Sequence, residues 1–165
     1  RGFRLPLLYN TSGYDSLETL QLLDGVVDIF LPDAKYADDD IASRLSGYKD
    51  YVAHNRIALL EMLRQVGDEL ILDQDGIALR GMIVRHLVLP NGLSQTPDVL
   101  HWLATHLSLR VHVSLMAQYF PTYRAVDEPE LARPVSEDEY AAALDAFDRV
   151  GLENGWRQQL ECDEE

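Results

Sequence analysis

The residues best suited to chemistry in this sequence stand where apolar segments end. Asp33 and Lys35 follow the run VVDIFLP (26–32) and lie two positions apart. Alternate side chains of an extended chain point the same way, so an acid and a base would share one face at this strand end. Such a pair can hold a zwitterion or a ribose, or it can form a rim salt bridge that contributes little energy. The local sequence leaves both interpretations open.

Arg85 raises a similar question, because it lies inside the apolar segment MIVRHLVLP (82–90). A guanidinium within an apolar strand needs a partner, since an unpaired buried charge is costly. The partner could be an acid of the same chain, which would make Arg85 structural. It could also be the carboxylate of a ligand, which the planar guanidinium binds well.

Two further strand ends carry polar groups. Asn10 and Thr11 close the segment LPLLYN (5–10) just before Gly13, and ordinary turn chemistry explains them on local evidence. Gln118 follows LRVHVSLM (109–116) and is uninformative by itself.

The apolar segments alternate with helical patterns. Strands are predicted over 5–10, 26–32, 82–90 and 109–116, and helices over 17–23, 38–46, 48–67, 96–107 and 136–152. A small hairpin is predicted over 69–80, with its turn at Asp75 and Gly76. The strand runs are continuous rather than alternating, which favours a parallel sheet buried on both faces. The fold class is therefore α/β.

Local signals bound the predicted helices. Asp15 or Ser16 is suited to cap the first helix, Ser136 and Glu139 form a capping box, and Thr96 and Pro97 are placed as N-cap and first helical residue. In the helix over 48–67, the residues at helical spacing are Tyr51, Ile57, Leu60 and Leu63, and Gly67 is a stop signal. Ligands of parallel α/β sheets bind at the carboxyl ends of the strands, so the polar strand ends should lie together.

Composition excludes several classes. The 165 residues carry a net charge of −14, which argues against a nucleic-acid or anionic-membrane surface. The one cysteine, Cys162, cannot form an intrachain disulfide or supply a set of thiolates for a metal, and it fits a cytoplasmic setting. His54, His101, His106 and His112 show no metal-ligand spacing. No run of 18 apolar residues exists, and the start without Met suggests a piece of something longer.

The strand-end strings resemble a known family. GFRLPLLYNTSGYDSLETLQLLDGVVDIFLPDAKY, GMIVRHLVLPNG and VSLMAQYFP are similar to the C-terminal half of radical SAM proteins related to pyruvate formate-lyase activating enzymes, in the uncharacterised activase-like branch. The resemblance covers about residues 2–125. It implies a partial (β/α) barrel, of which residues 1–125 would supply the third to sixth strands and residues 126–165 an acidic C-terminal helix and tail.

The resemblance also implies cofactors. In this family a CxxxCxxC loop holds a [4Fe–4S] cluster that binds S-adenosylmethionine and cleaves it reductively to a 5′-deoxyadenosyl radical. This chain lacks those cysteines, so the cluster is expected only in a full-length protein with the missing N-terminal half of the barrel. A reductant and a protein substrate, such as a glycyl-radical protein, would be further partners, and the present portion alone is expected to be inactive.

By position in the family's motifs, the resemblance assigns the cofactor-binding residues. Asn10 and Thr11 would lie near S-adenosylmethionine, and Asp33 and Lys35 at its ribose and carboxylate end. Arg85 would lie near the carboxylate, with Val88 or Leu89 against adenine. Gln118 stands where the activases commonly have a histidine that reaches the ribose.

Two other interpretations assign the chain to different functional classes. The chain could be a non-catalytic α/β binding or interaction module, or an aldolase-like enzyme that uses Lys35 as a Schiff-base amine. Under the radical SAM interpretation, the segment LPLLYN would lack the strand that it pairs with, and its apolar edge would favour self-association.

Overall fold

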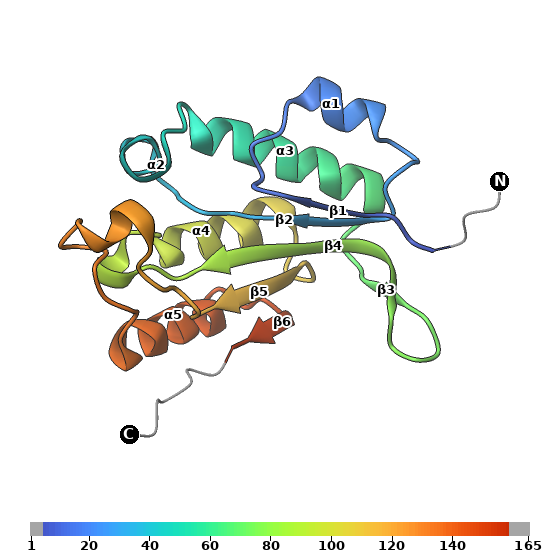
Figure 1. The fold of residues 1–165 in the computed structure, drawn as a ribbon. Coiled ribbons are helices and arrows are strands. Elements are labelled where there is room, and N and C mark those ends of the chain that lie inside the picture. The colour runs from blue at the N-terminus through green and yellow to red at the C-terminus, as the bar shows by residue number, and fades with distance from the viewer. Residues whose placement is uncertain (1–4, 159–165) are drawn as a thin grey trace.

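The computed structural model describes residues 5–158, which form a parallel β-sheet with flanking helices (Figure 1). The strands are β1 (Leu8–Thr11), β2 (Ile29–Pro32), β3 (Ile71–Leu72), β4 (Ala78–Leu87), β5 (His112–Met116) and β6 (Asn154–Arg157). The helices are α1 (Leu17–Leu22), α2 (Asp39–Ser46), α3 (Tyr51–Val66), α4 (Thr96–Trp102) and α5 (Glu137–Arg149). A π-helical turn (Leu103–Leu107) extends α4, and short 3₁₀ turns cover Pro90–Gly92 and Tyr123–Val126.

The strands run in the order β1-β2-β4-β5-β6, and each neighbouring pair is parallel. The prediction of an α/β fold with a parallel sheet is confirmed, and each of the four predicted strands is present. β3 pairs antiparallel with the start of β4, as the predicted hairpin requires. The second arm of that hairpin and the third predicted strand form one continuous strand, β4. β6 was not predicted, because the sequence NGWR has no apolar run.

Four helices, α1, α3, α4 and α5, pack on one side of the sheet, and the two faces differ along each strand. Phe30 of β2, Val84 of β4 and Val113 of β5 belong to one buried cluster with residues of α1, α3, α4 and α5. Their sequence neighbours Leu31 and Ile83 are only half-buried. The apolar runs predicted that the strands are buried on both faces. This prediction is wrong for most strand residues within 5–158, although Ile29 is buried on the other face. We call the side without helices the open face.

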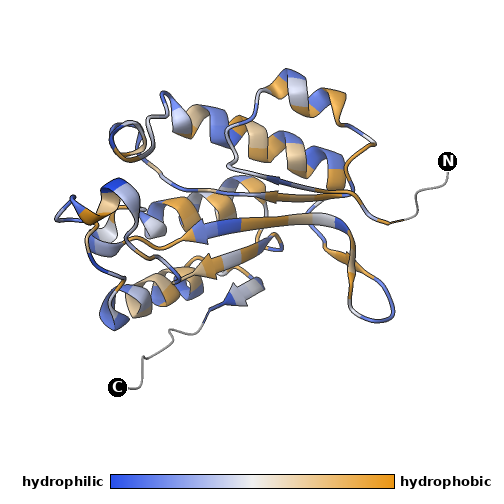
Figure 2. Ribbon diagram, viewed as in Figure 1, coloured by the Kyte–Doolittle hydropathy of each residue, from blue (hydrophilic) through white to orange (hydrophobic). Residues whose placement is uncertain are grey.

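Figure 2 shows an apolar stretch along β4 that is followed by polar residues at the arrowhead. In Figure 1 the helices lie above, behind and below the strands, and β4 and β5 cross the front of the view. β1 lies at one edge of the sheet and, among the described residues, pairs with β2 alone. None of the helices in residues 5–158 is long and apolar enough to cross a membrane.

The helix signals are largely confirmed. Ser16 caps α1, Ser136 and Glu139 form the capping box of α5, and Gly67 ends α3. Two details differ. Gln95, not Thr96, is the N-cap of α4, because the Thr96 hydroxyl bonds with a buried histidine and with Ser94 instead.

In α3 the buried face is not the one that the apolar spacing indicated. Tyr51 is fully buried, but Ile57 and Leu60 are exposed. Asn55 lies on the buried face, one turn beyond Tyr51. Polar contacts of this face, described below, explain why the polar Asn55 is buried while Ile57 and Leu60, on another side of α3, are exposed.

Candidate functional site

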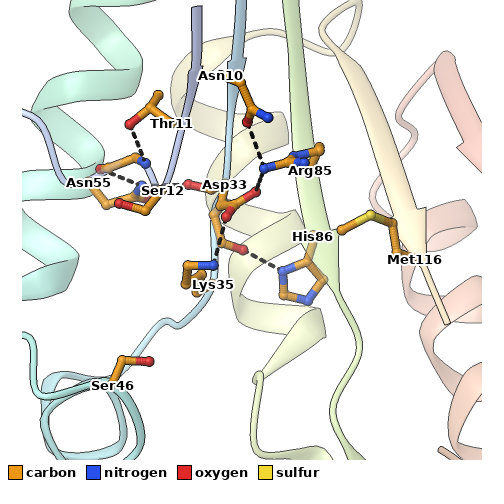
Figure 3. A network of polar contacts seen from close by, with 12 residues as sticks. Asn10, Thr11, Ser12, Asp33, Lys35, Ser46, Asn55, Arg85, His86 and Met116 are labelled. Carbon is orange, nitrogen blue, oxygen red and sulfur yellow. Dashed lines mark hydrogen bonds and ion pairs between the residues drawn. The ribbon is translucent and has the colours of Figure 1, made fainter. Parts of the chain in front are cut away.

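Asp33 joins two cations at the carboxyl ends of the strands (Figure 3). Its Oδ2 lies 2.6 Å from Lys35 Nζ, and its Oδ1 lies 2.7 Å from a terminal nitrogen of Arg85. A parallel β-bridge between Asp33 and Arg85 aligns the two residues across neighbouring strands. The acid and the base are therefore on one face, as the spacing predicted, and Arg85 has the acidic partner that its position required.

Asn10 completes the cluster from β1. Its Oδ1 accepts a hydrogen bond of 2.9 Å from the same terminal nitrogen of Arg85. Two cations and one anion leave this cluster with one excess positive charge, in a chain whose net charge is −14. The carboxyl ends of the strands are thus suited to an anionic group, although the protein as a whole would repel one.

A shallow depression of about 160 Å³ lies next to the cluster on the open face. Its lining residues are Asp33, Lys35, Arg85, Leu87, Met116 and Gln118. The Gln118 Oε1 accepts a hydrogen bond from Gln158 Nε2 at 3.3 Å, which ties this side of the depression to the chain after β6. Five of the assigned residues, Asn10, Asp33, Lys35, Arg85 and Gln118, therefore belong to the same end of the open face.

Thr11 and Val88 lie elsewhere. The Thr11 hydroxyl bonds with Asp15 Oδ2 at 2.5 Å and accepts from the Gly13 N–H at 3.1 Å, so it shapes the turn after β1, as local turn chemistry suggested. Val88 is buried in the cluster beneath the helices. It and Leu89 line a separate apolar hollow beside α5, whereas Leu87 faces the depression.

The backbone of residues 33–35 is held by side chains from other elements. Asn55 Nδ2 donates to the Asp33 carbonyl at 2.8 Å and to the Gly13 carbonyl at 2.9 Å. Tyr51 accepts a 2.9 Å hydrogen bond from the Lys35 N–H. Both side chains are buried. Burial of the Tyr51 hydroxyl raises its pKa above the ordinary value through desolvation.

His86 holds the third group of this segment. Its Nδ1 lies 2.6 Å from the Ala34 carbonyl, and its Nε2 lies 2.9 Å from the Thr96 hydroxyl. A carbonyl only accepts, so Nδ1 carries the proton and Nε2 accepts from Thr96. Burial lowers the pKa of His86 to about 4, so the ring is neutral near pH 7.

Gly13 lets the turn after β1 approach the end of β2. It has a φ of +72°, and a Cβ built on it would lie 2.2 Å from the Asp33 carbonyl oxygen and 2.3 Å from Asn55 Nδ2. Only glycine fits this place without displacing the backbone that carries Asp33.

Sequence reasoning missed Tyr51 and Asn55 as parts of this site, and it counted His86 only among the polar groups at the end of the third predicted strand. His86 was visible as a histidine in an apolar strand, but its partners Ala34 and Thr96 lie 52 and 10 positions away. Asn55 had one usable signal, an amide four residues after Tyr51 on the same side of α3. Such long-range hydrogen bonds cannot be read from spacing along one element.

Two further properties bear on ligands. The Arg85 Nε is buried and has no hydrogen-bond partner within residues 5–158, so the guanidinium keeps an unused donor. No group of three His, Cys, Asp or Glu in that part of the chain could hold a metal ion. Cys162 lies outside the described residues.

No family model matches the chain. Over 153 residues it is 30% identical to the uncharacterized protein MJ0674 of Methanocaldococcus jannaschii, an alignment that covers 90% of this chain. The same alignment covers only 40% of the archaeal protein, so the chain spans well under half the length of this relative.

Proposed function

We propose that this chain is the C-terminal portion of a radical SAM protein of the pyruvate formate-lyase activating enzyme type, and that its open face binds S-adenosylmethionine. In the full-length protein, a [4Fe–4S] cluster would cleave this cofactor reductively to a 5′-deoxyadenosyl radical, with a glycyl-radical protein as one candidate substrate. The observation that carries the proposal is the Asp33, Lys35 and Arg85 cluster at the carboxyl ends of parallel strands.

The charges of the cluster match those of the cofactor. S-adenosylmethionine has an anionic carboxylate, a cationic ammonium and a cationic sulfonium, together with ribose hydroxyls. Lys35 and Arg85 would bind the carboxylate, and Asp33 would accept hydrogen bonds from the ribose or the ammonium. Arg85 lines the depression and its side chain is 28% exposed, so its guanidinium can reach a carboxylate bound there.

The open face gives the cofactor a place to lie. Parallel sheets are ordinarily covered on both faces, and here the helices cover one. A sheet with helices on one side and ligand groups on the other is the arrangement expected of part of a (β/α) barrel, whose interior holds the ligand. The four strand-end strings supply the remaining support through their family resemblance.

The iron–sulfur cluster does not fit the described residues, because they provide no set of metal ligands. Cluster ligands would have to come from another part of a longer protein, in keeping with the length of the archaeal relative. This chain's own contribution is confined to binding and orienting the cofactor.

The Schiff-base alternative receives no support from the geometry. Lys35 Nζ forms an ion pair with Asp33, and an ion-paired ammonium is not a nucleophile. A binding module without catalysis would use the same depression, and its test is the same titration.

Titration with S-adenosylmethionine, followed by amide chemical shifts, tests the proposal. We expect shifts centred on residues 33–35 and 85–87, and weaker binding of 5′-methylthioadenosine, which lacks the amino and carboxylate groups. Arg85→Gln should weaken binding of S-adenosylmethionine by about tenfold, as the loss of one charge-assisted hydrogen bond implies.

Arg110→Gln is the matched control. Like Arg85, Arg110 is ion-paired, in its case with Asp68 and Glu69, but it precedes β5 and so lies at the opposite end of that strand. Equal effects of the two substitutions, or shifts that avoid the depression, would count against the proposed site.

A further inference from the structure

Residues 33–35 depart from ordinary strand pairing in one respect. They continue β2, yet much of their backbone hydrogen bonding goes to side chains. The Asp33 N–H donates to Thr11 and the Ala34 N–H to Arg85, which is strand-like backbone pairing. The next groups, the carbonyls of Asp33 and Ala34 and the Lys35 N–H, bond with Asn55, His86 and Tyr51.

We infer that Tyr51, Asn55 and His86 are positioning residues that hold the 33–35 backbone so that the side chains of Asp33 and Lys35 stay on the open face beside Arg85. The inference rests on the proposed function for its purpose, although its test does not require the cofactor.

The three side chains come from the covered side of the sheet. Tyr51 and Asn55 belong to α3, and His86 belongs to β4. Each is at most 4% exposed, so water cannot replace it as a partner of the backbone. Loss of one of these contacts leaves a buried polar group unpaired, which favours local opening of the segment.

His86 is also hydrogen-bonded to a chain of two hydroxyls, those of Thr96 and Ser94. The Leu89 N–H donates to Ser94 Oγ, and Ser94 Oγ lies 3.1 Å from Thr96 Oγ1. Since Thr96 donates its own proton to His86 Nε2, Ser94 must donate to Thr96. This direction follows from the tautomer in which His86 Nδ1–H donates to the Ala34 carbonyl.

The lysines of this sequence provide a direct assay. Lys35 and Lys49 are its only two lysines, and Arg44 stands between them, so tryptic cleavage at arginine separates them. Lys35 is partly shielded and ion-paired, whereas Lys49 is exposed. Acetylation of the folded chain, quantified by mass spectrometry, therefore measures exposure of Lys35 with Lys49 as internal reference.

Tyr51→Phe is the decisive variant, because it removes only the hydroxyl and keeps the buried ring. We expect the Lys35 to Lys49 acetylation ratio and the exchange rate of the Ala34 amide to rise about fivefold, as the loss of one neutral hydrogen bond implies. Tyr140→Phe is the matched control, since Tyr140 is also buried and donates to the Leu115 carbonyl. It should leave both readouts unchanged.

Thr96→Val provides a second approach through His86, and it covers the case in which Tyr51→Phe does not fold. It should raise the same two readouts, and Thr96→Ser should restore the wild-type values. Unchanged readouts in Tyr51→Phe, or an equal rise in Tyr140→Phe, would overturn the inference. Failure of the wild-type chain to bind S-adenosylmethionine would count against the proposed function alone, because neither readout involves the cofactor.

Discussion

The two faces of the sheet differ in how deeply their side chains are buried and in the chemical groups that they carry. On the covered face, Phe30 and Val84 pack among helices and are fully buried. On the open face, Asp33 pairs with both Lys35 and Arg85, and all three side chains remain partly exposed. The same strands thus carry the stability of the fold on one side and the candidate ligand groups on the other, and the one-residue alternation of a strand separates the two roles.

The largest expected effect tests this separation directly. Phe30→Ala should lower the free energy of unfolding by about 3–5 kcal/mol, because it leaves a cavity beneath the helices. Leu31→Ala, one position along β2 on the open face, should cost about 1 kcal/mol. Urea denaturation of both variants measures the difference, and similar losses would contradict the assignment of the two faces.

A second expected effect concerns pH. Burial lowers the pKa of His86 to about 4, and an unfolded histidine has a pKa near 6.5. As pH falls through this range, the unfolded chain binds a proton that the folded chain does not. Stability should therefore be unaffected by His86 above pH 6.5 and fall by about 3 kcal/mol in total by pH 4.

His86→Gln should flatten this slope. Burial also lowers the pKa of His112, which leaves a smaller loss in the same direction. Hydrogen bonds from Arg64 and Arg133 lower the pKa values of Glu61 and Glu139 to about 2. Protonation of these two carboxylates therefore reduces stability only below about pH 4.5. An unchanged slope between pH 6.5 and 4.5 in the variant would show that His86 is not buried in neutral form.

Two glycines of nearly equal φ distinguish backbone conformation from close packing. Gly13 and Gly25 have φ values of +72° and +74°, but nothing lies within 4 Å of a Cβ on Gly25. Gly25→Ala should cost about 1 kcal/mol from φ alone. Gly13→Ala should cost about 1–3 kcal/mol more, since its Cβ collides with the Asp33 carbonyl. Thermal unfolding compares the two variants, and equal costs would show that the close approach at Gly13 adds nothing to the cost.

The smallest expected effect concerns self-association through the β1 edge. Leu8 is exposed on the open face of this edge strand, and unpaired edges favour association between chains. We expect the weight-average mass from light scattering to rise with concentration, and Leu8→Lys to reduce the rise a few-fold. Leu22→Lys, on α1, makes the same change at another exposed leucine and should have no effect. A wild-type monomer at high concentration would contradict the expectation.

Much of the fold was accessible from sequence because its signals are local. The apolar runs before Asn10 and Asp33 and around Arg85 placed three strands, and Ser136 with Glu139 placed α5. β6 was missed, since its pairing depends on β5 rather than on its own composition. The exposed Ile57 and buried Asn55 of α3 show the same limit, because the neighbouring strand end decided which helix face is buried.

By itself, the sequence determined that Asp33 and Lys35 share a face, since residues two apart in an extended chain always do. It also determined that polar groups follow each apolar strand. Only the tertiary structure decided that Arg85 and Asn10 complete the cluster, that Thr11 and Val88 point elsewhere, and that Tyr51, Asn55 and His86 hold the segment. Those contacts join residues far apart along the chain, and strand order and packing set them rather than local pattern.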